Sequence, residues 1–244
     1  MNRSAALLVI VAGCRADDYL SYTWDDRRVL CSESVDDMTQ TLNWDRIESQ
    51  IAQAERERWV TMMHAHQPGI TISIDAIDKL LTMADDHHLD YVTFSELTPD
   101  GMPRGGLALA FDDDDVEGWF LLRDTFKAHG VRLTFFVTRW HELTTIPGAD
   151  GVPSELDMLA ILATDGHDLQ PHSVNHLNAP NYVQAHGLAA YLADEVLPSI
   201  QVMADAGFHP TTFAFPFGAT TEEINAAVLQ QIDKVRTTPG PCPW

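Results

Sequence analysis

After residue 58, the sequence alternates between two kinds of segment. The first kind is a short segment that predicts a β-strand, at residues 59–64, 90–94, 107–111, 131–138, 167–171, 211–215 and 234–238; some of these, such as 107–111, are nearly continuous apolar runs. The second kind has apolar residues at helical spacing, which predicts a helix, at residues 73–88, 115–129, 153–166, 182–205 and 220–231. Strands that are buried on both faces read as such apolar runs. The alternation therefore predicts an α/β barrel or open sheet, with parallel strands and helices outside.

Residues with special backbone roles support several of these boundaries. Ser73 precedes the helix predicted at 73–88 and is suited to accept a hydrogen bond from its first turn. Gly130 and Gly166 follow two other predicted helices, where glycine commonly ends a helix. We find no inter-domain linker and no repeat at a fixed period, so the sequence indicates one domain after an irregular leader.

Polar side chains that could bind a metal or take part in catalysis follow two of the predicted strands. Asp112–Asp115 come directly after the strand at 107–111, and His172 and His176 come just after the strand at 167–171. In parallel α/β folds, chemistry collects at the carboxyl ends of the strands. Two histidines and one carboxylate are a recurrent zinc ligand set that leaves a position open for water. An acidic run alone is more often a solvated turn, but both features together predict a metal site.

Charge and composition reduce the number of possible binding partners. The chain has 244 residues with a net charge of −21, from 36 acidic and 15 basic side chains. Nucleic-acid binding needs a basic surface, and so does electrostatic docking on anionic lipid. The composition therefore argues against both kinds of partner.

The N-terminus predicts export. An apolar run follows Arg3 and ends at Gly13-Cys14, which resembles the lipobox of bacterial lipoproteins. This interpretation divides the chain into a signal peptide (1–13), an anchor and leader (14–30) and one domain (31–244). It predicts a protein tethered by lipid on Cys14, in the periplasm or at the cell surface. A buried N-terminal strand is the alternative interpretation of the apolar run.

The candidate site residues carry a resemblance to a known family. AFDDDD, at residues 110–115, resembles the TFDD motif of the polysaccharide deacetylases (NodB homology, carbohydrate esterase family 4). HSVNH (172–176) is similar to the family's H-S/T-x-x-H motif, and FAFPFG (213–218) to its YPFG-type segment. The resemblance implies that Asp112 is the catalytic base and that Asp113, His172 and His176 bind a metal. It also implies a distorted (β/α) barrel and substrate contacts from Phe215, Pro216 and Phe217.

The family's last motif occurs before its first motif in this chain. The family ends on L-x-H, whose histidine is the general acid, then a helix and a strand. Met62-Met63-His64 and the segment up to Leu97 resemble that ending, and residues 34–44 loosely resemble the D-x-x-D-W region before it. The resemblance therefore implies a circularly permuted domain with His64 as the acid. His66 is an alternative acid or a substrate contact.

The permutation implies that the strand at 234–238 lies beside the start of the domain. Cys31 and Cys242 would then flank the break, where they could form a disulfide if the protein is exported, with two free thiols as the alternative.

Two departures from the family pattern bear on the site. Asp114 stands where the family has glycine, and we expect Asp114 and Asp115 in a solvated turn or at a helix start. Ala214 aligns with the arginine that usually orients the base, so the sequence leaves the partner of Asp112 open.

The sequence thus predicts a metal-dependent hydrolase that removes N-acetyl groups from the amino sugars of a glycan. The expected cofactor is one divalent ion, Zn²⁺ first, with Co²⁺ or Ni²⁺ as alternatives. A related amidase that acts on a non-sugar amide and a non-catalytic glycan-binding lipoprotein remain the alternative functions.

Overall fold

The structure, a computed structural model, describes residues 18–240 and Cys242. The strands are β1 (Ser21–Tyr22), β2 (Val29–Cys31), β3 (Glu33–Ser34), β4 (Val60–Ala65), β5 (Asp90–Tyr91), β6 (Gly106–Asp113), β7 (Thr134–Val137), β8 (Asp168–Pro171), β9 (Thr212–Ala214) and β10 (Lys234–Thr237). The helices are α1 (Trp44–Glu57), α2 (Ile74–Asp86), α3 (Val116–Leu121), α4 (Arg123–Ala128), α5 (Glu155–Thr164), α6 (Ala179–His186), α7 (Leu188–Tyr191), α8 (Leu197–Asp205) and α9 (Glu222–Val228).

Parallel strands form the centre of the molecule. In the larger sheet, β4, β6, β7 and β8 lie side by side and run parallel, as predicted, with β5 beside the start of β6. Strand β1 is antiparallel to β4 at the edge. The smaller sheet has the order β2-β10-β9, and its strands are also parallel.

The segment Val29–Ser34 connects the two sheets. Its first half, β2, pairs with β10, and its second half, β3, pairs with β4. Between them, the Ser32 amide donates to the Thr237 carbonyl (3.1 Å). On the other side, the Gln170 side chain on β8 accepts hydrogen bonds from the amides of Thr211 and Thr212, both at 2.8 Å. These links arrange the parallel strands around a common interior.

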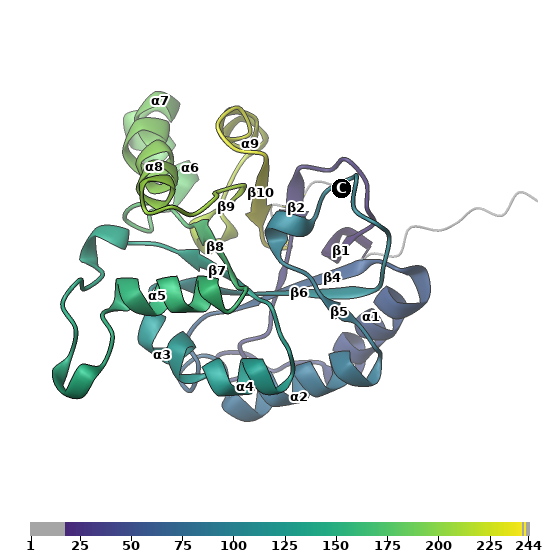
Figure 1. Cartoon of the computed structure of the whole chain (residues 1–244). Helices are drawn as coiled ribbons and strands as arrows, with labels where there is room; N and C mark the ends of the chain where they lie inside the picture. The colour runs from purple at the N-terminus through teal and green to yellow at the C-terminus, as the bar shows by residue number, and fades with distance from the viewer. Residues whose placement is uncertain (1–17, 241, 243–244) are drawn as a thin grey trace, which may run out of the picture.

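Alternating side chains divide the strands between an interior and an outer core. Val60 and Met62 of β4 pack in one buried cluster with Ala108 and Ala110 of β6. The intervening residues Met63 and Leu109 belong to a second cluster, which faces the helices. Helices α1–α5 lie along one side of the larger sheet, and α6–α9 lie over β9 and β10 (Figure 1). Among the described residues, no helix is both long and apolar enough to cross a membrane.

Several predicted boundaries are confirmed. Ser73 caps α2 by accepting a hydrogen bond from the Ala76 amide, and Gly130 and Gly166 follow α4 and α5 with φ of 64° and 98°. The parallel pairing of β10 with β2 confirms that the start of the domain and the strand at 234–238 are neighbours.

Other predictions of regular structure were wrong. The helix expected at 115–129 is two short helices, because the chain leaves the regular helical conformation at Leu122. The single helix expected at 182–205 is interrupted at Gly187 and again by a π-helical segment, η5 (Leu192–Val196). Sequence patterning also missed β2, β3 and α1, which precede residue 59.

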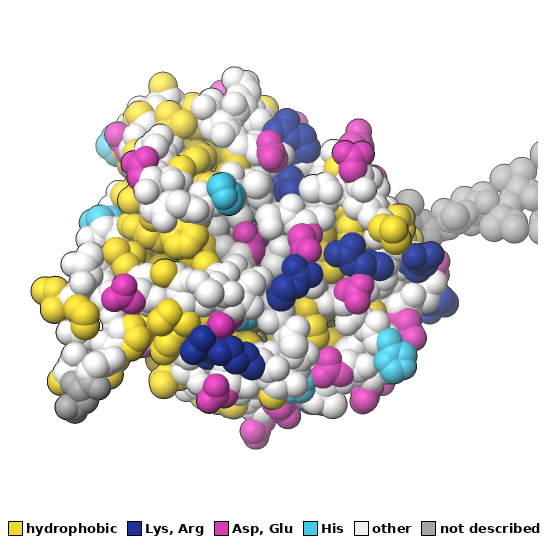
Figure 2. All heavy atoms as spheres, viewed as in Figure 1, with side chains coloured by type: hydrophobic (Ala, Val, Ile, Leu, Met, Phe, Trp, Pro, Cys, Tyr) yellow, Lys and Arg dark blue, Asp and Glu magenta, His cyan; other side chains and the backbone are white. Residues whose placement is uncertain are grey.

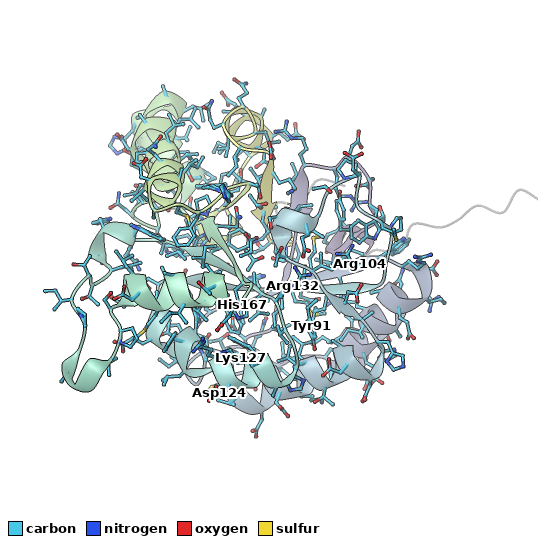
Figure 3. The ribbon with its side chains drawn as sticks, in the orientation of Figure 1. Tyr91, Arg104, Asp124, Lys127, Arg132 and His167 are labelled. Atoms are coloured by element: carbon cyan, nitrogen blue, oxygen red, sulfur yellow. A yellow bond between two sulfur atoms is a disulfide. The ribbon has the colours of Figure 1, made fainter. Side chains whose placement is uncertain are left out.

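The amino ends of the strands form the face opposite the candidate site. Arg104, Arg132 and His167, labelled in Figure 3, come directly before β6, β7 and β8. Arg104 pairs with Asp90 (3.1 Å), and Arg132 donates to Glu96 (2.9 Å). Basic and acidic side chains are interspersed on this face (Figure 2). The strands therefore direct their carboxyl ends, and the residues that follow them, to the other end of the molecule.

Candidate metal centre and active site

The structure brings Asp113, His172 and His176 together. Asp113 is the last residue of β6, and both histidines follow β8. Oδ1 of Asp113 lies 3.6 Å from Nε2 of His172 and 3.0 Å from Nε2 of His176. Two ligands on one tetrahedral zinc ion, with bonds of about 2 Å, are separated by roughly 3.3 Å. The spacing of these three side chains therefore fits a single metal ion.

Hydrogen bonding prepares this group for a cation. Nδ1 of His172 lies 2.8 Å from the Ala214 carbonyl, which can only accept, so Nδ1 donates there and Nε2 is the nitrogen that faces Asp113. Oδ1 of Asp113 is buried without a hydrogen-bond partner. Burial alone would raise the pKa of Asp113, but His172 and His176 outweigh it and hold that pKa well below its ordinary value. An ionised carboxylate beside two imidazole nitrogens is a donor set for a divalent ion.

A buried glutamate holds the loop that carries the two histidines. Glu195, fully buried in η5, accepts hydrogen bonds from the amide (2.9 Å) and the side chain (2.6 Å) of Asn175. Asn175 precedes His176, whose φ is 57°, and Ser173 also has a positive φ of 67°. Residues in such strained conformations persist when their surroundings hold them. Glu195 therefore fixes the loop in the shape that aims both histidines at Asp113.

Asp112 is paired with an arginine that the sequence analysis missed. Arg236 of β10 donates to Oδ2 of Asp112, and these residues are 1% and 2% exposed. Oδ1 of Asp112 is buried without a partner. Burial acts to raise the pKa of Asp112, but the charge of Arg236 outweighs it, so the carboxyl group is ionised at neutral pH. Asp112 thus has one oxygen held by Arg236 and one that is free to take a proton.

The register explains how Arg236 replaces the expected arginine. Ala214, which aligns with the family arginine, lies directly across from Arg236 in the β9–β10 pair. The arginine that holds the base therefore lies on β10 in this chain, opposite the β9 position at which the family has it. An arginine within the strand predicted at 234–238 was the available signal, because a charged residue in a buried strand needs a partner.

His64, on β4, and His66, just after the end of β4, differ in burial and in pKa. His64 is 3% exposed, and its Nδ1 lies 2.9 Å from Oγ of Ser32. Burial, and then the charge of Arg236, lowers the pKa of His64 to about 3. His66 is partly exposed, and its Nδ1 lies 2.6 Å from Oδ2 of the buried Asp36. Burial opposes its ionisation, but Asp36 outweighs burial and raises the pKa of His66 to about 9.

The three remaining substrate candidates separate into core and surface. Phe215 is fully buried and packs against Phe213, with ring centroids 5.2 Å apart, and Pro216 is also buried. Phe215 shares a buried cluster with Ile224 of α9, so these two buried residues belong to the core rather than to a groove wall. Phe217 is 65% exposed, and its ring centroid lies 4.7 Å from that of His176. Among these three residues, only Phe217 is placed to meet a bound molecule.

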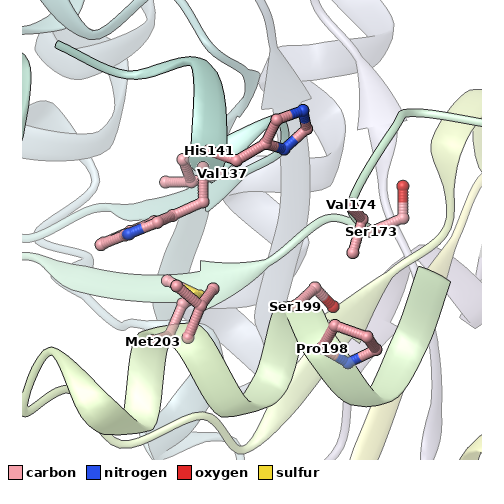
Figure 4. A pocket seen from close by; sticks show the side chains of 9 residues that line it. Val137, His141, Ser173, Val174, Pro198, Ser199 and Met203 are labelled. Carbon is pink, nitrogen blue, oxygen red and sulfur yellow. The ribbon is translucent and has the colours of Figure 1, made fainter. Parts of the chain in front are cut away.

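Two hollows adjoin the metal ligands. A cleft of about 440 Å³ is lined by polar side chains that include Asp36, Gln40, His66, Gln67 and Asp113. A second cavity of about 160 Å³ lies beside the metal-ligand loop at Ser173 and Val174, facing Pro198 and Met203 of α8 (Figure 4). Its lining is mostly apolar. Chemistry that needs charged groups therefore belongs to the polar cleft.

Residues near the ends of the domain and of the acidic run also have clear positions. Cys31 and Cys242 form a disulfide with Cα atoms 6.0 Å apart. Asp114 pairs with Arg139 at 2.9 Å rather than facing only solvent, and Asp115 is the N-cap residue of α3. Cys14 and the predicted signal peptide lie outside the described residues.

Taken together, the parallel α/β fold, the converging side chains of Asp113, His172 and His176 and the free oxygen of Asp112 form a candidate metal site of the kind that hydrolases use. The sequence model of the family described as polysaccharide deacetylase matches residues 100–234, more than half of the chain. The chain therefore belongs to the polysaccharide deacetylase family, whose members are hydrolases. The match includes Asp112, Asp113, His172 and His176, whereas His64 and His66 precede it.

Solved structures agree with this fold. The deacetylase PplD of Streptococcus pyogenes, in complex with acetate, is 13% identical with a TM-score of 0.53, over 72% of this chain and 91% of that one. IcaB from Ammonifex degensii is 14% identical with a TM-score of 0.57, over 70% and 79% of the two chains. A de-N-acetylase from Aggregatibacter actinomycetemcomitans is 16% identical with a TM-score of 0.56, over 71% and 85%. No curated protein matches this chain.

Proposed function

We propose that this protein is a metal-dependent N-deacetylase that releases acetate from N-acetylated amino sugars of a glycan. The observation that carries the proposal is the buried, unpartnered Oδ1 of Asp113 facing Nε2 of His172 and of His176. This donor set fits zinc, and also Co²⁺ or Ni²⁺. The bound ion would supply a Lewis acid for the acetyl carbonyl and lower the pKa of water.

The other residues supply positioning and proton transfer. Asp112 is held by Arg236 through one oxygen, so the other oxygen can accept a proton from the attacking water. Water adds to the carbonyl carbon, the carbon–nitrogen bond breaks, and the nitrogen must gain a proton to leave as an amine. The exposed ring of Phe217 beside His176 offers a face against which a sugar can pack.

The test is acetate release from a panel of N-acetylated glycans, with wild type compared with Asp112→Asn. We expect zinc-loaded wild type to release acetate, and Asp112→Asn to lose at least about 100-fold in rate. The variant should still bind one equivalent of zinc, because Asp113 and both histidines remain. Equal activity of the two proteins would remove Asp112 as the base. A wild type that binds no metal and releases no acetate would favour a glycan-binding function.

We infer, in addition, that the domain is a circular permutation of the family's usual order. The parallel neighbours β10 and β2 support this inference, because they join the end of the matched range to the start of the domain. Strand β4 lies beside β6 although it precedes the match, so it occupies the place expected of the family's final strand.

We also propose that the protein is exported and anchored by lipid on Cys14. The Cys31–Cys242 disulfide supports export, because such bonds persist in oxidising compartments. In cells fed a labelled fatty acid, we expect label on the wild-type protein and none on Cys14→Ser, which should leave the membrane fraction. Equal labelling of the two proteins would refute the anchor.

A further inference from the structure

Strand β7 lies between the two strands that lead to the candidate metal ligands, but it supplies no ligand itself. The register places Val137, the last residue of β7, opposite Asp113 of β6 on one side. On the other side, Val137 is opposite Pro171 of β8, which directly precedes His172. The residues that follow β7 therefore lie between the segment that carries Asp113 and the loop that carries both histidines.

Thr138 and Arg139, the first two residues after β7, make hydrogen bonds to both of these segments. The Thr138 amide donates to the Asp113 carbonyl (3.0 Å), and the buried Thr138 hydroxyl donates to the Ser173 carbonyl (3.2 Å). The Arg139 amide donates to the Val174 carbonyl (3.1 Å). The end of β7 is thus the place where the two ligand-bearing segments are connected.

The Arg139 side chain adds a contact to the backbone hydrogen bonds. Its Nη1 donates to Oδ2 of Asp114 at 2.9 Å, and Asp114 directly follows Asp113 in the chain. The family pattern has glycine at the position of Asp114, so this ion pair is a feature of this chain rather than of the pattern. Arg139 therefore holds the Asp113 segment with its side chain and the histidine loop with its amide.

Backbone strain is concentrated around these contacts. Eight non-glycine residues in the described part of the chain have a positive φ, and five of them lie at the site: Asp113 (85°), Arg139 (47°), Ser173 (67°), His176 (57°) and Phe217 (59°). Non-glycine residues persist in such conformations only where their surroundings hold them. The separation of the ligands therefore depends on contacts that keep both segments in place, and Arg139 contacts both.

We propose that Arg139, through its ion pair with Asp114, is a positioning residue that sets the separation of Asp113 from the two histidines for metal binding. The proposal rests on the metal-dependent function argued above. A guanidinium carries only hydrogen-bond donors, so Arg139 cannot itself be a ligand. It can act on metal affinity only through position or through charge.

Position and charge predict opposite results when Arg139 is replaced. A cation near the site repels a metal ion, so a pure charge effect would make metal binding tighter once the guanidinium is lost. A positioning effect would make metal binding weaker, because the segment that carries Asp113 would no longer be held at the distance that one ion requires. The sign of the change in affinity therefore separates the two explanations.

The experiment measures zinc affinity by competition with a chelator. We expect Arg139→Gln to bind zinc about 3–10-fold more weakly than wild type, a modest factor because the pair is partly exposed and does not touch the ion. Asp114→Asn should also weaken binding, and the double variant should bind no more weakly than the weaker single variant, since both changes break one contact. In about 1 M NaCl the difference between wild type and Arg139→Gln should shrink, because salt screens exposed charges.

Arg132→Gln is the matched control. Arg132 donates to Glu96 at 2.9 Å, and these side chains are 43% and 32% exposed, against 35% and 30% for Arg139 and Asp114. Arg132 comes directly before β7, at the other end of the strand, so its loss should leave zinc affinity unchanged. The visible absorption of bound Co²⁺, which depends on the arrangement of its ligands, should change in Arg139→Gln and stay the same in Arg132→Gln.

Three outcomes separate this proposal from the deacetylase function. If Arg139→Gln binds zinc as tightly as wild type, or more tightly, the positioning role fails, and the metal site and the deacetylase function stand. If Arg139→Gln binds zinc more weakly but wild type releases no acetate from any N-acetylated glycan, the positioning role stands and the deacetylase function fails. A wild type that binds no zinc would overturn both.

Discussion

The buried pair of Arg236 and Asp112 allows a stringent test, because stability and catalysis depend on the same contact. Arg236→Met keeps an apolar stem near the Phe136 ring, over which the guanidinium now lies at 4.9 Å. It removes the only protein hydrogen bond that the structure describes for the Asp112 side chain, which is 3% exposed. A buried charge that loses its partner costs about 3–5 kcal/mol.

Urea unfolding of the metal-free protein measures this cost. With a slope of about 2 kcal/mol per molar urea, the midpoint of Arg236→Met should fall by roughly 2 M. Asp112→Asn should also be destabilised, because it leaves the Arg236 charge buried. The double variant removes both charges, so its loss should be smaller than the sum of the two single losses by at least about 2 kcal/mol. Additive losses, or a loss below about 1 kcal/mol for Arg236→Met, would refute the reasoning.

The pH dependence gives a second check with a definite sign. In wild type, Arg236 outweighs burial and lowers the pKa of Asp112, so the pair stabilises the fold at neutral pH and loses this effect as pH falls. In Arg236→Met, burial acts without that charge and raises the pKa of Asp112 relative to wild type. The difference in unfolding free energy between the two proteins should therefore shrink as pH falls. A constant difference would contradict the assignment.

Three further predictions concern the supports of the site. Glu195→Gln should weaken zinc binding by about 10–100-fold, measured by competition with a chelator, whereas the neighbouring Asp194→Asn should not; equal affinities would refute the clamp on the ligand loop. Replacing Cys31 and Cys242 together by serine should lower the unfolding free energy by about 2–5 kcal/mol, and no loss would show that the bond is dispensable. Because the pKa of His66 is raised to about 9, its contribution to stability is present below about pH 6.5 and is lost as pH rises through 9; His66→Asn should lack this decline, and an identical decline would refute it.

The three candidate metal ligands were accessible from the sequence because each follows a recognisable strand. Asp113 ends the apolar run of β6, and His172 follows β8, so parallel strands bring them to the same end of the sheet. The interval between His172 and His176 also suggested that both could reach one cation. For these three residues, the pattern of a predicted strand followed by a polar side chain was sufficient to find them.

The partners of these residues were less accessible, because they depend on register between distant strands. Arg236 reaches Asp112 across 124 positions of sequence, and Asp36 reaches His66 across 30. No periodicity encodes such a pair, since each residue alone is an ordinary charged side chain. The contact of Glu195 with Asn175 was missed for a similar reason, because it joins two residues 20 positions apart that no apolar spacing relates.

The charges of the site together favour Asp113 as the place for the proposed metal. Arg236 neutralises Asp112, and His66, whose pKa is raised, neutralises Asp36. Among the residues described at the polar cleft, Asp113 is the carboxylate that faces two histidine side chains rather than an arginine or lysine. A divalent ion there would give the three-ligand centre one net positive charge. Amide hydrolysis develops negative charge on the carbonyl oxygen. A cation bound at Asp113, whose carboxylate has no arginine or lysine partner, would stabilise that charge.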